Sequence, residues 1–442
     1  MRREILMPPV TPSMTDGKIS RWHVAEGQAV AAGDLLVEIA TSSATVEIEA
    51  EDEGRVERIL FPAGTEGVKV NTPIAILLNA ARDVQRPSLG QPLSFAALDP
   101  VLEAPKLPAR PASSHLEGAG RSYREALRDA LADEMRRDKD VFLIGVDVAQ
   151  NRGAPKVAQG LLDAFGPSRV VSVSSIEEAV LGIAVGAAYA GLKPVVELPS
   201  WGASFEAWAP YVASAAETFF LSAGRLPVPI VLRGPNGFAP GLTGQDARCV
   251  AAQLAQIPGL KVAQPATASA AYGLLAAAIR DPGPVAVLEH DQLYAVRGPA
   301  EPEDVLALGV ARVRRAGSDV TLVAAGRAVL LAVEAASLLS AEGVEAEVVD
   351  LMSVRPLDRD AVAASVRRTG LLVTLEDGWG DGGIGAELVA SIVERCFVAL
   401  KAAPVRLAGA GVPMPYASEL QTLALPTAKQ VFQAVLASVR GA

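Results

Sequence analysis

Two adjacent acids open a long apolar stretch of the chain. Glu177 and Glu178 begin the segment EEAVLGIAVGAAYAGL, which is otherwise built almost wholly from Ala, Val, Ile, Leu and Gly. Acids in the first turn of a helix are favoured by the helix dipole, by about 0.3–1 kcal/mol. A carboxyl at the mouth of an apolar interface can also exchange a proton with a ligand bound there. The pattern therefore predicts either a stabilised helix end or a catalytic carboxyl.

The residues around this run predict the elements that would position it. Short apolar runs, VFLIG, RVVSV, PVVEL, PIVLRG and PVAVLEH, alternate with helical patterns such as SYREALRDALADEM. This alternation is typical of a doubly wound α/β domain with a parallel sheet, which we expect over residues 122–298. The helix that starts at Glu177 is apolar on all sides, so we expect it to be deeply buried. The runs DVTLVAAG, AEVVDL and GLLVTLED predict a second α/β domain over residues 305–442.

The N-terminal part of the chain contains an internal repeat. The segment that starts at Gly17 is followed by a similar segment that starts at Gly54, 37 residues later, and both show short alternating strands with Gly, Pro and Asp at the turns. This pattern predicts a small all-β domain over residues 1–80, in which the hairpin IATSSATVEI joins the two halves. Residues 81–121 are rich in Pro and Ala, and this composition predicts a partly extended linker.

The composition restricts the classes of partner. The 442 residues carry 40 Lys and Arg against 50 Asp and Glu, a net charge of −10, with no clustered basic run, which argues against nucleic acid as a partner. The two cysteines, Cys249 and Cys396, have no zinc-ligand or disulfide-framework spacing. We find no run that is typical of a signal peptide or a membrane span, so we expect a cytoplasmic protein without a membrane partner.

From Ser122 to nearly its end, the chain resembles the β subunit of the decarboxylating component of pyruvate dehydrogenase and its branched-chain and acetoin relatives. The matching segments are GVDVAQNRGAPKV, LGIAVGAAYAGLKPVVE, LPVPIVLRGPNG, IPGLKVAQP, AAAIRDPGPVAVLE and GAGVPMPYA. The resemblance implies a pyrimidine-binding domain of the thiamine diphosphate enzymes, followed by a transketolase C-terminal domain. It places Glu177 on the glutamate that shares a proton with N1′ of the aminopyrimidine. It also implies cofactor contacts at Pro199 and at an aromatic that packs on the pyrimidine. The matching residue is Ala203, and Trp201 and Phe205, two residues away on either side, are the candidates to substitute for it.

The same resemblance implies an α subunit in an α2β2 assembly. Thiamine diphosphate needs a diphosphate and Mg²⁺ site, usually Gly-Asp-Gly with an Asn downstream. Gly380-Asp381-Gly382 has the tripeptide, but LAGAGVPMP supplies no Asn, so we interpret the match as coincidental and expect the α subunit to hold the diphosphate and Mg²⁺. A family K⁺ site, mostly of backbone carbonyls, would map to Ile230, Ala278, Ile279, Asp281 and Gly283. The alternative is that Asp281 simply ends a helix.

The N-terminal repeat resembles a lipoyl/biotinyl domain, a flattened barrel whose central hairpin carries a modified lysine at its tip. Lipoyl tips usually read Glu-Thr-Asp-Lys-Ala, and the matching residues here are Ala40, Thr41, Ser42, Ser43 and Ala44. Ser43 stands in place of the lysine, and Lys18 and Lys69 lie elsewhere in the repeat. A serine hydroxyl cannot form the amide that attaches lipoate. We therefore expect no lipoate on this chain and a role for the domain in docking or assembly.

Several departures from the family concentrate around the expected active site. A histidine that helps to orient substrate and the accepting lipoyl group is replaced by Asp246, and an acid usual after the first strand is replaced by Val146, with Asp147 next to it. Of three histidines, only His290 lies in the catalytic region, without an assigned role. An anion at position 246 would repel a 2-oxo acid carboxylate but could accept a hydrogen bond from a hydroxyl. Asp246 is, with Glu177, a candidate catalytic residue.

Three functions stay open on the sequence alone. In the first, the chain and an α subunit form a two-carbon carbanion or enamine and pass the two-carbon unit to a lipoyl or acyl carrier protein. The donor is then a 2-oxo acid such as pyruvate, or a ketose phosphate cleaved in transketolase fashion for specialised biosynthesis. In the second, ordinary pyruvate dehydrogenase function persists through compensating residues. In the third, the chain is a catalytically weak scaffold or regulator, although a dead site has no need for Glu177.

Overall fold

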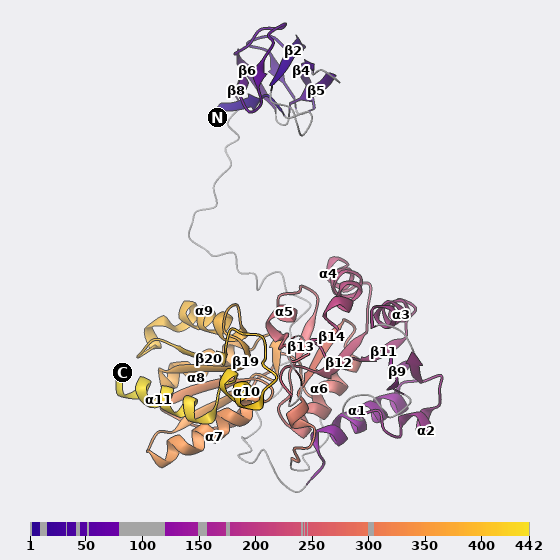
Figure 1. Ribbon diagram of the computed structural model, residues 1–442, viewed down its shortest axis with the longest axis vertical. Helices are drawn as coiled ribbons and strands as arrows, with labels where there is room; N and C mark the ends of the chain where they lie inside the picture. The colour runs from indigo at the N-terminus through magenta and orange to yellow at the C-terminus, as the bar shows by residue number, and fades with distance from the viewer. Residues whose placement is uncertain are drawn as a thin grey trace. The chain divides into compact units, whose positions relative to one another are not determined.

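The computed structural model divides the chain into two compact units, Met1–Leu98 and Asp99–Ala442, and each is described by itself (Figure 1). The structure describes residues 2–8, 16–31, 33–40, 45–50, 53–78, 120–148, 157–173, 177–239, 242, 244, 246–298 and 305–441. No helix within these ranges is both long enough and apolar enough to cross a lipid bilayer.

The first unit consists of two four-stranded antiparallel sheets that enclose one small core. The sheet order β5-β4-β2-β7 combines Thr45–Glu49, Leu35–Ala40, Asp16–Trp22 and Val68–Lys69. The order β1-β8-β6-β3 combines Arg2–Leu6, Pro73–Leu78, Gly54–Ile59 and Ala29–Val30. The two orders correspond strand for strand under the sequence repeat, because β2 matches β6 and β4 matches β8. Ile19, Ile39 and Ile74 fill the core between the sheets. This arrangement confirms the predicted lipoyl-like flattened barrel.

The second unit begins with a seven-stranded sheet in the order β10-β9-β11-β12-β14-β13-β18. Its first six strands are parallel: Val170–Val173, Val141–Val146, Lys193–Glu197, Val231–Pro235, Val285–Glu289 and Lys261–Ala263. The seventh, β18 (Ser353–Arg355), comes from the C-terminal half of the chain and pairs antiparallel with β13. A strand of the second α/β region therefore completes the sheet of the first.

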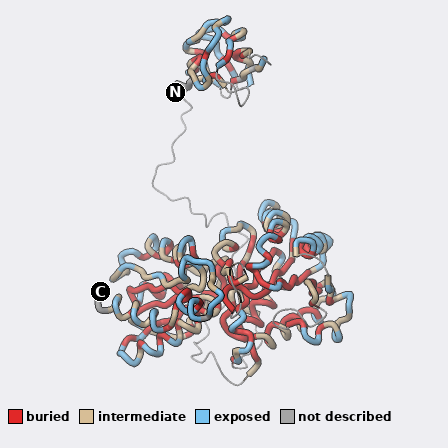
Figure 2. The backbone as a smooth tube through the Cα atoms, in the orientation of Figure 1, coloured by how far each residue is buried: buried red, intermediate tan, exposed pale blue. Residues whose placement is uncertain are grey.

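Helices cover both faces of this sheet, which explains why its strands are almost continuously apolar. Helices α1 (Tyr123–Arg137) and α6 (Ala268–Arg280) pack on one face, against residues such as Leu143. Helix α3 (Glu177–Tyr189) packs on the other face, against residues such as Ile144. Figure 1 shows the two layers on opposite sides of the strands, and Figure 2 shows the buried residues concentrated between them.

The C-terminal half contains a five-stranded sheet in the order β15-β17-β16-β19-β20. These strands span Arg312–Arg315, Ala346–Asp350, Val320–Ala324, Leu372–Trp379 and Val405–Gly409. Helices α7 (Ala328–Ala341) and α11 (Ala428–Gly441) cover one face, and α8 (Arg359–Thr369) and α9 (Ile384–Cys396) cover the other. The observed architecture confirms the predicted fold class, an all-β domain followed by two α/β sheets.

Shorter elements complete the chain and carry several residues of the candidate site. They are α2 (Leu161–Phe165), η3 (Phe205–Ala207), the π-helix η4 (Pro210–Ala216), α4 (Glu217–Leu221), α5 (Ala251–Ala255), η5 (Asp291–Leu293), η6 (Phe397–Ala399) and α10 (Ser418–Ala424).

Helix α3 differs from its expectation. It begins at Glu177 as predicted, but only one of its faces is buried against the sheet, through residues such as Leu181 and Val185. On the opposite face, 52% of Ile183 and 51% of Tyr189 are exposed. The prediction of a helix buried on all sides is therefore wrong for this chain alone, and an apolar helix face is left open.

Candidate active site

The C-terminal ends of the six parallel strands lie along one edge of the sheet, and Glu177, Phe205 and Asp246 follow three of these strands in the chain. Strand β10 lies on one side of β9, and β11, the next strand along the chain, lies on the other side. Such a reversal of strand order is a topological switch point, where open α/β sheets form a ligand-binding crevice. Helix α3 makes the connection from β10 to β11, so its first residue, Glu177, stands at this edge.

Glu177 is half-buried in the first turn of α3, whereas Glu178 is exposed. Among the residues that the structure covers, none forms an ion pair or hydrogen bond with the Glu177 carboxylate. The local sequence explains the position, because the apolar residues after Glu177 bury one face of the helix and leave its first turn at the sheet edge. Of the two acids, Glu177 is the one placed between the packed face and solvent.

The aromatic residues after β11 have different positions although the sequence spaces them evenly. Trp201 is fully buried, and its indole N–H donates to the carbonyl of Val287 at 3.3 Å. Phe205 is 44% exposed and begins η3, which packs against α3. Trp208 lies between them, with its ring centre 6.0 Å from that of Trp201 and 4.8 Å from that of Phe205. Phe205 is therefore the ring that can meet a ligand, together with the exposed Pro199.

Two polar atoms in this turn lack partners among the residues with described positions. The Ser204 hydroxyl and the Trp208 indole N–H are buried and form no hydrogen bond. Buried donors without a hydrogen-bond partner are rare in native proteins, because each one lowers the free energy of unfolding by about 1–3 kcal/mol. Their location directly beside Phe205 indicates that a ligand or a partner chain completes this turn.

The loop after β12 brings Asp246 and Arg248 to the same edge. Asn236 accepts from the N–H of Val250 at 2.8 Å, and the Gly237 N–H donates to the Arg248 carbonyl at 3.2 Å, so the two ends of the loop are tied together. Asp246 is half-buried. The guanidinium carbon of Arg248 lies 4.9 Å from the centre of the Phe205 ring. The loop therefore joins the candidate aromatic contact to the candidate acid.

Arg248 was not predicted from the sequence as a site residue. The available signal was its position two residues after Asp246, since a cation next to an unexpected anion can restore the local charge. Its contact with Phe205 links segments 43 residues apart and could not be read from the local pattern.

Beneath this edge lies a buried ionic network. Arg233, which is fully buried, hydrogen-bonds with the carboxylates of Glu197 and Glu289 on the neighbouring strands β11 and β14. The hydroxyl of Tyr294 donates to Glu289 at 2.6 Å. Burial raises the pKa of Glu197, although the Arg233 charge opposes that shift. The network ties together three strands whose ends carry the candidate site.

His290 follows β14 and lies where the two α/β sheets meet. Its Nδ1 accepts from the N–H of Gln292 at 3.2 Å, and its Nε2 has no hydrogen-bond partner among the described atoms. Asp377 Oδ2, at the end of β19, lies 3.8 Å from Nε2 but is engaged in an ion pair with Arg327. Burial lowers the pKa of His290 to about 4. His290 is therefore neutral at pH 7 and serves as packing under the Gly237 turn.

Strand β9 ends in an unusual backbone conformation at the switch point. Asp147 has φ of 53°, in the left-handed region, where Asp is tolerated far better than a β-branched residue. Val146 is the last residue of the strand and keeps an extended conformation. Asp147 therefore lies at this end of the strand, one residue after Val146, the position at which the family resemblance implies an acid.

The predicted K⁺ ligands lie together at the opposite edge of the sheet, before β12 and β14. Asp281 caps the C-terminus of α6, and its carboxylate is already engaged: Oδ2 pairs with the Lys261 ammonium at 2.6 Å, and Oδ1 accepts from the Gly283 N–H at 2.9 Å. The carbonyls of Ile230 and Ala278 each accept a backbone hydrogen bond; Ile279 is buried. A cation here would be held by backbone oxygens and not by the Asp281 side chain.

The tripeptide Gly380-Asp381-Gly382 forms the loop between β19 and α9. The two amides that begin α9, those of Ile384 and Gly385, donate to the Glu376 carboxylate at 3.1 and 2.9 Å. Burial raises the pKa of Glu376. Because the chain's own acid occupies this helix end, the loop has no open amide cradle for a diphosphate there, which supports the interpretation of the tripeptide as coincidental.

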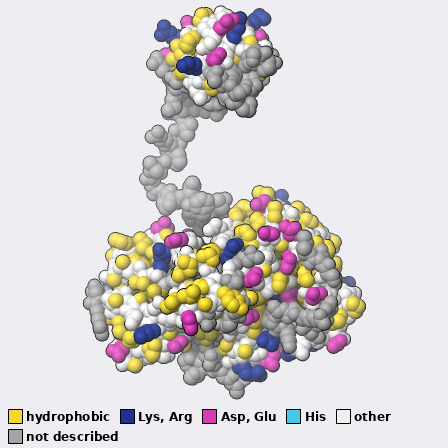
Figure 3. Space-filling model, viewed as in Figure 1, with side chains coloured by type: hydrophobic (Ala, Val, Ile, Leu, Met, Phe, Trp, Pro, Cys, Tyr) yellow, Lys and Arg dark blue, Asp and Glu magenta, His cyan; other side chains and the backbone are white. Residues whose placement is uncertain are grey.

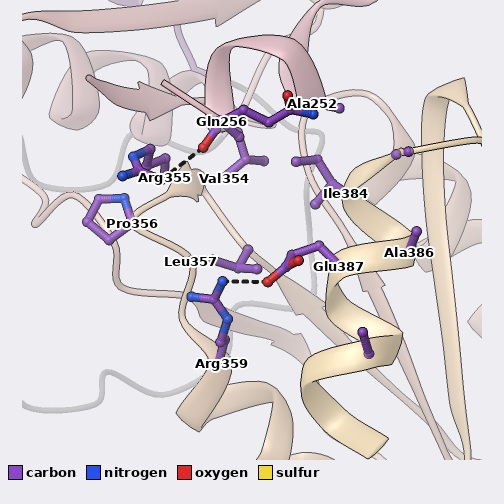
Figure 4. Close-up of a pocket in the computed structure, with 14 residues that line it drawn as sticks. Ala252, Gln256, Val354, Arg355, Pro356, Leu357, Arg359, Ile384, Ala386 and Glu387 are labelled. Atoms are coloured by element: carbon purple, nitrogen blue, oxygen red, sulfur yellow. Dashed lines mark hydrogen bonds and ion pairs between the residues drawn. The ribbon is translucent and has the colours of Figure 1, made fainter. Parts of the chain in front are cut away.

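Two of the clefts on the second unit lie away from Glu177. One, of about 620 Å³, lies between α5, β18 and α9, where Arg359 pairs with Glu387 at 2.8 Å (Figure 4). The other, of about 710 Å³, is lined by Tyr189, Leu226 and Pro229 at the far edge of the sheet. Glu177, Phe205 and Asp246 line neither of these two clefts.

The tip of the lipoyl-like hairpin lies outside the described residues, which omit Thr41, Ser42, Ser43 and Ala44. The strands on either side are described: β4 and β5 pair antiparallel, with Ala40 opposite Thr45. The two strands that would hold a modifiable side chain at the tip are therefore paired.

Three family models match the chain in order. They are "Biotin-requiring enzyme" over residues 3–77, "Transketolase, pyrimidine binding domain" over residues 119–297 and "Transketolase, C-terminal domain" over residues 309–431. Among solved structures, "Split gene transketolase, inactive beta4 tetramer" has a TM-score of 0.61 at 24% identity and covers 73% of this chain and 99% of its own. At that identity the likeness supports the fold alone.

Curated relatives match at higher sequence identity. The pyruvate dehydrogenase E1 component subunit beta of Rhizobium meliloti is 44% identical over 455 residues, which cover 98% of each chain. The mitochondrial β subunits of Oryza sativa (beta-2) and Drosophila melanogaster are 46% and 47% identical and cover 74% and 72% of this chain and 90% and 89% of their own. This chain therefore belongs to the family of pyruvate dehydrogenase E1 component β subunits, thiamine diphosphate-dependent enzymes.

Proposed function

We propose that this chain is the β half of a heteromeric enzyme that takes a two-carbon unit from a 2-oxo acid and passes it to a carrier on another protein. The observation that carries the proposal is the position of Glu177, at the start of the apolar helix that connects β10 to β11, beside the switch point of a parallel sheet. The exposed ring of Phe205 on the adjoining turn gives the carboxyl a neighbour suited to an aromatic heterocycle.

The residues at this edge fit the aminopyrimidine half of thiamine diphosphate. When bound, this cofactor supplies the electron sink for the pair left when the bond beside a carbonyl breaks. Glu177 would hold and return the proton at ring nitrogen N1′, which a carboxyl can do and an amide cannot. Phe205 would pack against the ring, and the Ser204 hydroxyl and Trp208 N–H offer hydrogen-bonding groups beside it. Trp201 supports the turn from the core.

We assign the diphosphate and Mg²⁺ to the α subunit. Within the described ranges, no group of three or more His, Cys, Asp or Glu side chains is arranged to bind a metal ion. The helix end nearest the Gly-Asp-Gly loop is occupied by Glu376. A K⁺ ion on this chain would be coordinated by backbone carbonyls beside the Lys261–Asp281 pair, where it would stabilise the loop and take no part in the chemistry.

The open face of α3 supports direct contact with the α subunit. Gly182 and Gly186 lie one turn apart on this face, and a Cβ added to either would meet nothing within 4 Å. Glycines spaced in this way let a second helix approach closely, and Ile183 supplies apolar area beside them. Apolar side chains also gather on the surface over α10, from Tyr416, Leu420 and Leu423 (Figure 3). Buried in an assembly, these surfaces would hold the α subunits of an α2β2 enzyme.

The carrier that accepts the two-carbon unit is a separate lipoyl or acyl carrier protein in the cytoplasm. We place the carrier on another protein because the Ser43 hydroxyl cannot form the amide that attaches lipoate. Asp246, on the loop that borders the site, would accept a hydrogen bond from the hydroxyl that forms on the substrate.

The test is reconstitution with an α subunit of the same enzyme family. The purified heteromer should bind thiamine diphosphate in the presence of Mg²⁺ by calorimetry, and this chain alone should not. With pyruvate, the heteromer should release CO₂ and reduce an artificial electron acceptor. Cofactor binding by the isolated chain, or a cofactor-loaded heteromer that is inert toward every 2-oxo acid tried, would contradict the proposal.

A further inference from the structure

We infer that Arg248 binds the anionic group of the donor substrate, a carboxylate or a phosphate, at the edge that carries Glu177. This inference rests on the proposed function, because it assigns the recognition of the substrate to a residue of the same site.

The first argument is the fixed location of the side chain. The guanidinium carbon lies 4.9 Å from the centre of the Phe205 ring, which is the exposed aromatic of the site. A cation over an aromatic face is held without losing its hydrogen-bond donors, because the ring contacts the plane of the guanidinium and leaves its edge open. Phe205 therefore positions a planar donor fork at the crevice.

The second argument is that this fork has no acid partner among the residues the structure describes. Three other arginines held in the second unit are paired with acids: Arg233 with Glu289, Arg327 with Asp377, and Arg314 with Asp350. Among the described residues, the Arg248 side chain contacts the Phe205 ring, and its backbone carbonyl accepts from the Gly237 N–H. An arginine held in place at a crevice, with its donors open, is suited to bidentate recognition of an anion.

The third argument is charge. Glu177 and Asp246 both border this edge, and two carboxylates alone would repel an anionic donor. Arg248 follows Asp246 by two residues on a loop whose ends are tied by the Asn236–Val250 hydrogen bond. It supplies a positive charge beside the acid that stands where the family resemblance implies a histidine. The donor fork suits a carboxylate and a phosphate equally, so the chemistry that it recognises is an oxyanion.

The experiment uses the reconstituted heteromer and three variants, Arg248→Gln, Arg248→Lys and Arg225→Gln. Arg225 is exposed on the loop before β12, at the opposite edge of the sheet, and is the matched control. Binding of oxalate and of inorganic phosphate is measured by calorimetry, and KM and kcat are measured for pyruvate against methyl pyruvate and for a ketose phosphate against the free ketose.

Arg248→Gln should weaken binding of one oxyanion probe by about 10–100-fold, as expected for a lost charge-assisted pair. KM for the corresponding charged donor should rise by a similar factor, KM for its neutral partner should be unchanged, and Arg248→Lys should recover part of the loss. If the donor is a 2-oxo acid, Arg248→Gln should weaken oxalate binding and raise KM for pyruvate. If the donor is a ketose phosphate, it should weaken phosphate binding and raise KM for the ketose phosphate. Arg225→Gln should behave as wild type.

The outcomes separate this inference from the proposed function. Equal losses for charged and neutral donors, or unchanged oxyanion binding in Arg248→Gln, overturn the role of Arg248 while the enzyme itself stays active. In the reverse case, the wild-type heteromer turns over no 2-oxo acid, and the Arg248→Gln heteromer is the one variant that loses oxyanion binding. That result overturns the proposed reaction and supports the oxyanion site.

Discussion

His290 Nε2 lies 3.8 Å from Asp377 Oδ2, across the junction between the two α/β sheets of the second unit. The pair is not a salt bridge at neutral pH, because burial holds the pKa of His290 at about 4 and Asp377 is already paired with Arg327. The contact therefore joins the sheets by packing a neutral imidazole beside a carboxylate whose charge is balanced by Arg327.

This arrangement predicts a loss of stability in mild acid. The folded pKa of His290 is about 4 against an ordinary value of 6.5, so the unfolded chain binds the proton more readily and stability falls as the pH drops from about 6.5 toward 4. At pH 5 the loss from this group is about 2 kcal/mol. Asn at this position can still accept from the Gln292 N–H. His290→Asn should therefore be less sensitive than wild type when urea unfolding is compared at pH 7 and pH 5; equal sensitivity would contradict the assignment.

Much of this architecture could be predicted from the sequence, because its signals are local. The alternation of apolar runs and helical patterns indicated the parallel sheet, and the repeat from Gly17 to Gly54 indicated the barrel. The open face of α3 could not be predicted, since an apolar surface packed inside one chain and one awaiting a partner have the same composition. Strand β18 is only three residues long and takes its position from pairing with β13, far away in the sequence.

The candidate site shows the same division. The position of Glu177 at the start of a helix was predictable from the change in composition at that residue. Trp201 and Phe205 are equally spaced around Ala203, and only the packing of Trp201 beneath Val287 distinguishes the core residue from the exposed one. Arg248 and His290 gain their neighbours through tertiary contacts, which no local pattern encodes.

Glu177→Gln should abolish most turnover without affecting the fold. The amide keeps the size and a hydrogen bond but cannot exchange a proton, and general acid–base steps contribute about 10²–10⁴-fold in rate. The measurement is kcat of the reconstituted heteromer, together with its melting temperature. Glu178→Gln, on the exposed neighbour in the same turn, is the control and should retain the wild-type rate. A rate within a few-fold of wild type for Glu177→Gln would remove this residue from the mechanism.

Gly182→Leu should block assembly but leave this chain folded. A side chain at position 182 meets nothing within 4 Å, and replacing a helical glycine stabilises a helix by about 0.5–1 kcal/mol. The isolated variant should therefore melt no lower than wild type, while co-purification with the α chain should be lost because a second helix can no longer approach. Ala364→Leu, at an exposed position of α8, is the control. Normal co-purification of Gly182→Leu would place the α subunit elsewhere.

Arg233→Met should strongly destabilise the second unit. It leaves Glu197 and Glu289 buried without a cation, and loss of one partner of a buried ion pair typically costs about 3–5 kcal/mol. Replacing both acids by Gln in the Met variant should recover part of this loss, because the unpaired buried charges are then removed. Urea unfolding measures each free energy. Arg297→Met, which breaks an exposed pair with Glu125, should change stability by less than about 1 kcal/mol.

The lipoyl-like domain should carry no lipoate, but should accept it once its tip is restored. Strands β4 and β5 keep the paired hairpin, with Ala40 opposite Thr45, so the substitution of the lysine by Ser43 removes the amine and not the framework. After co-expression with a lipoyl ligase, intact mass of the full chain should show no lipoyl addition for wild type and one addition for the double variant Ser42→Asp, Ser43→Lys. Lipoylation of wild type would show that the tip is misassigned.

If the domain serves docking or assembly instead, deletion of residues 1–80 should weaken binding to the α chain or the carrier protein while Glu177-dependent turnover of a free donor persists.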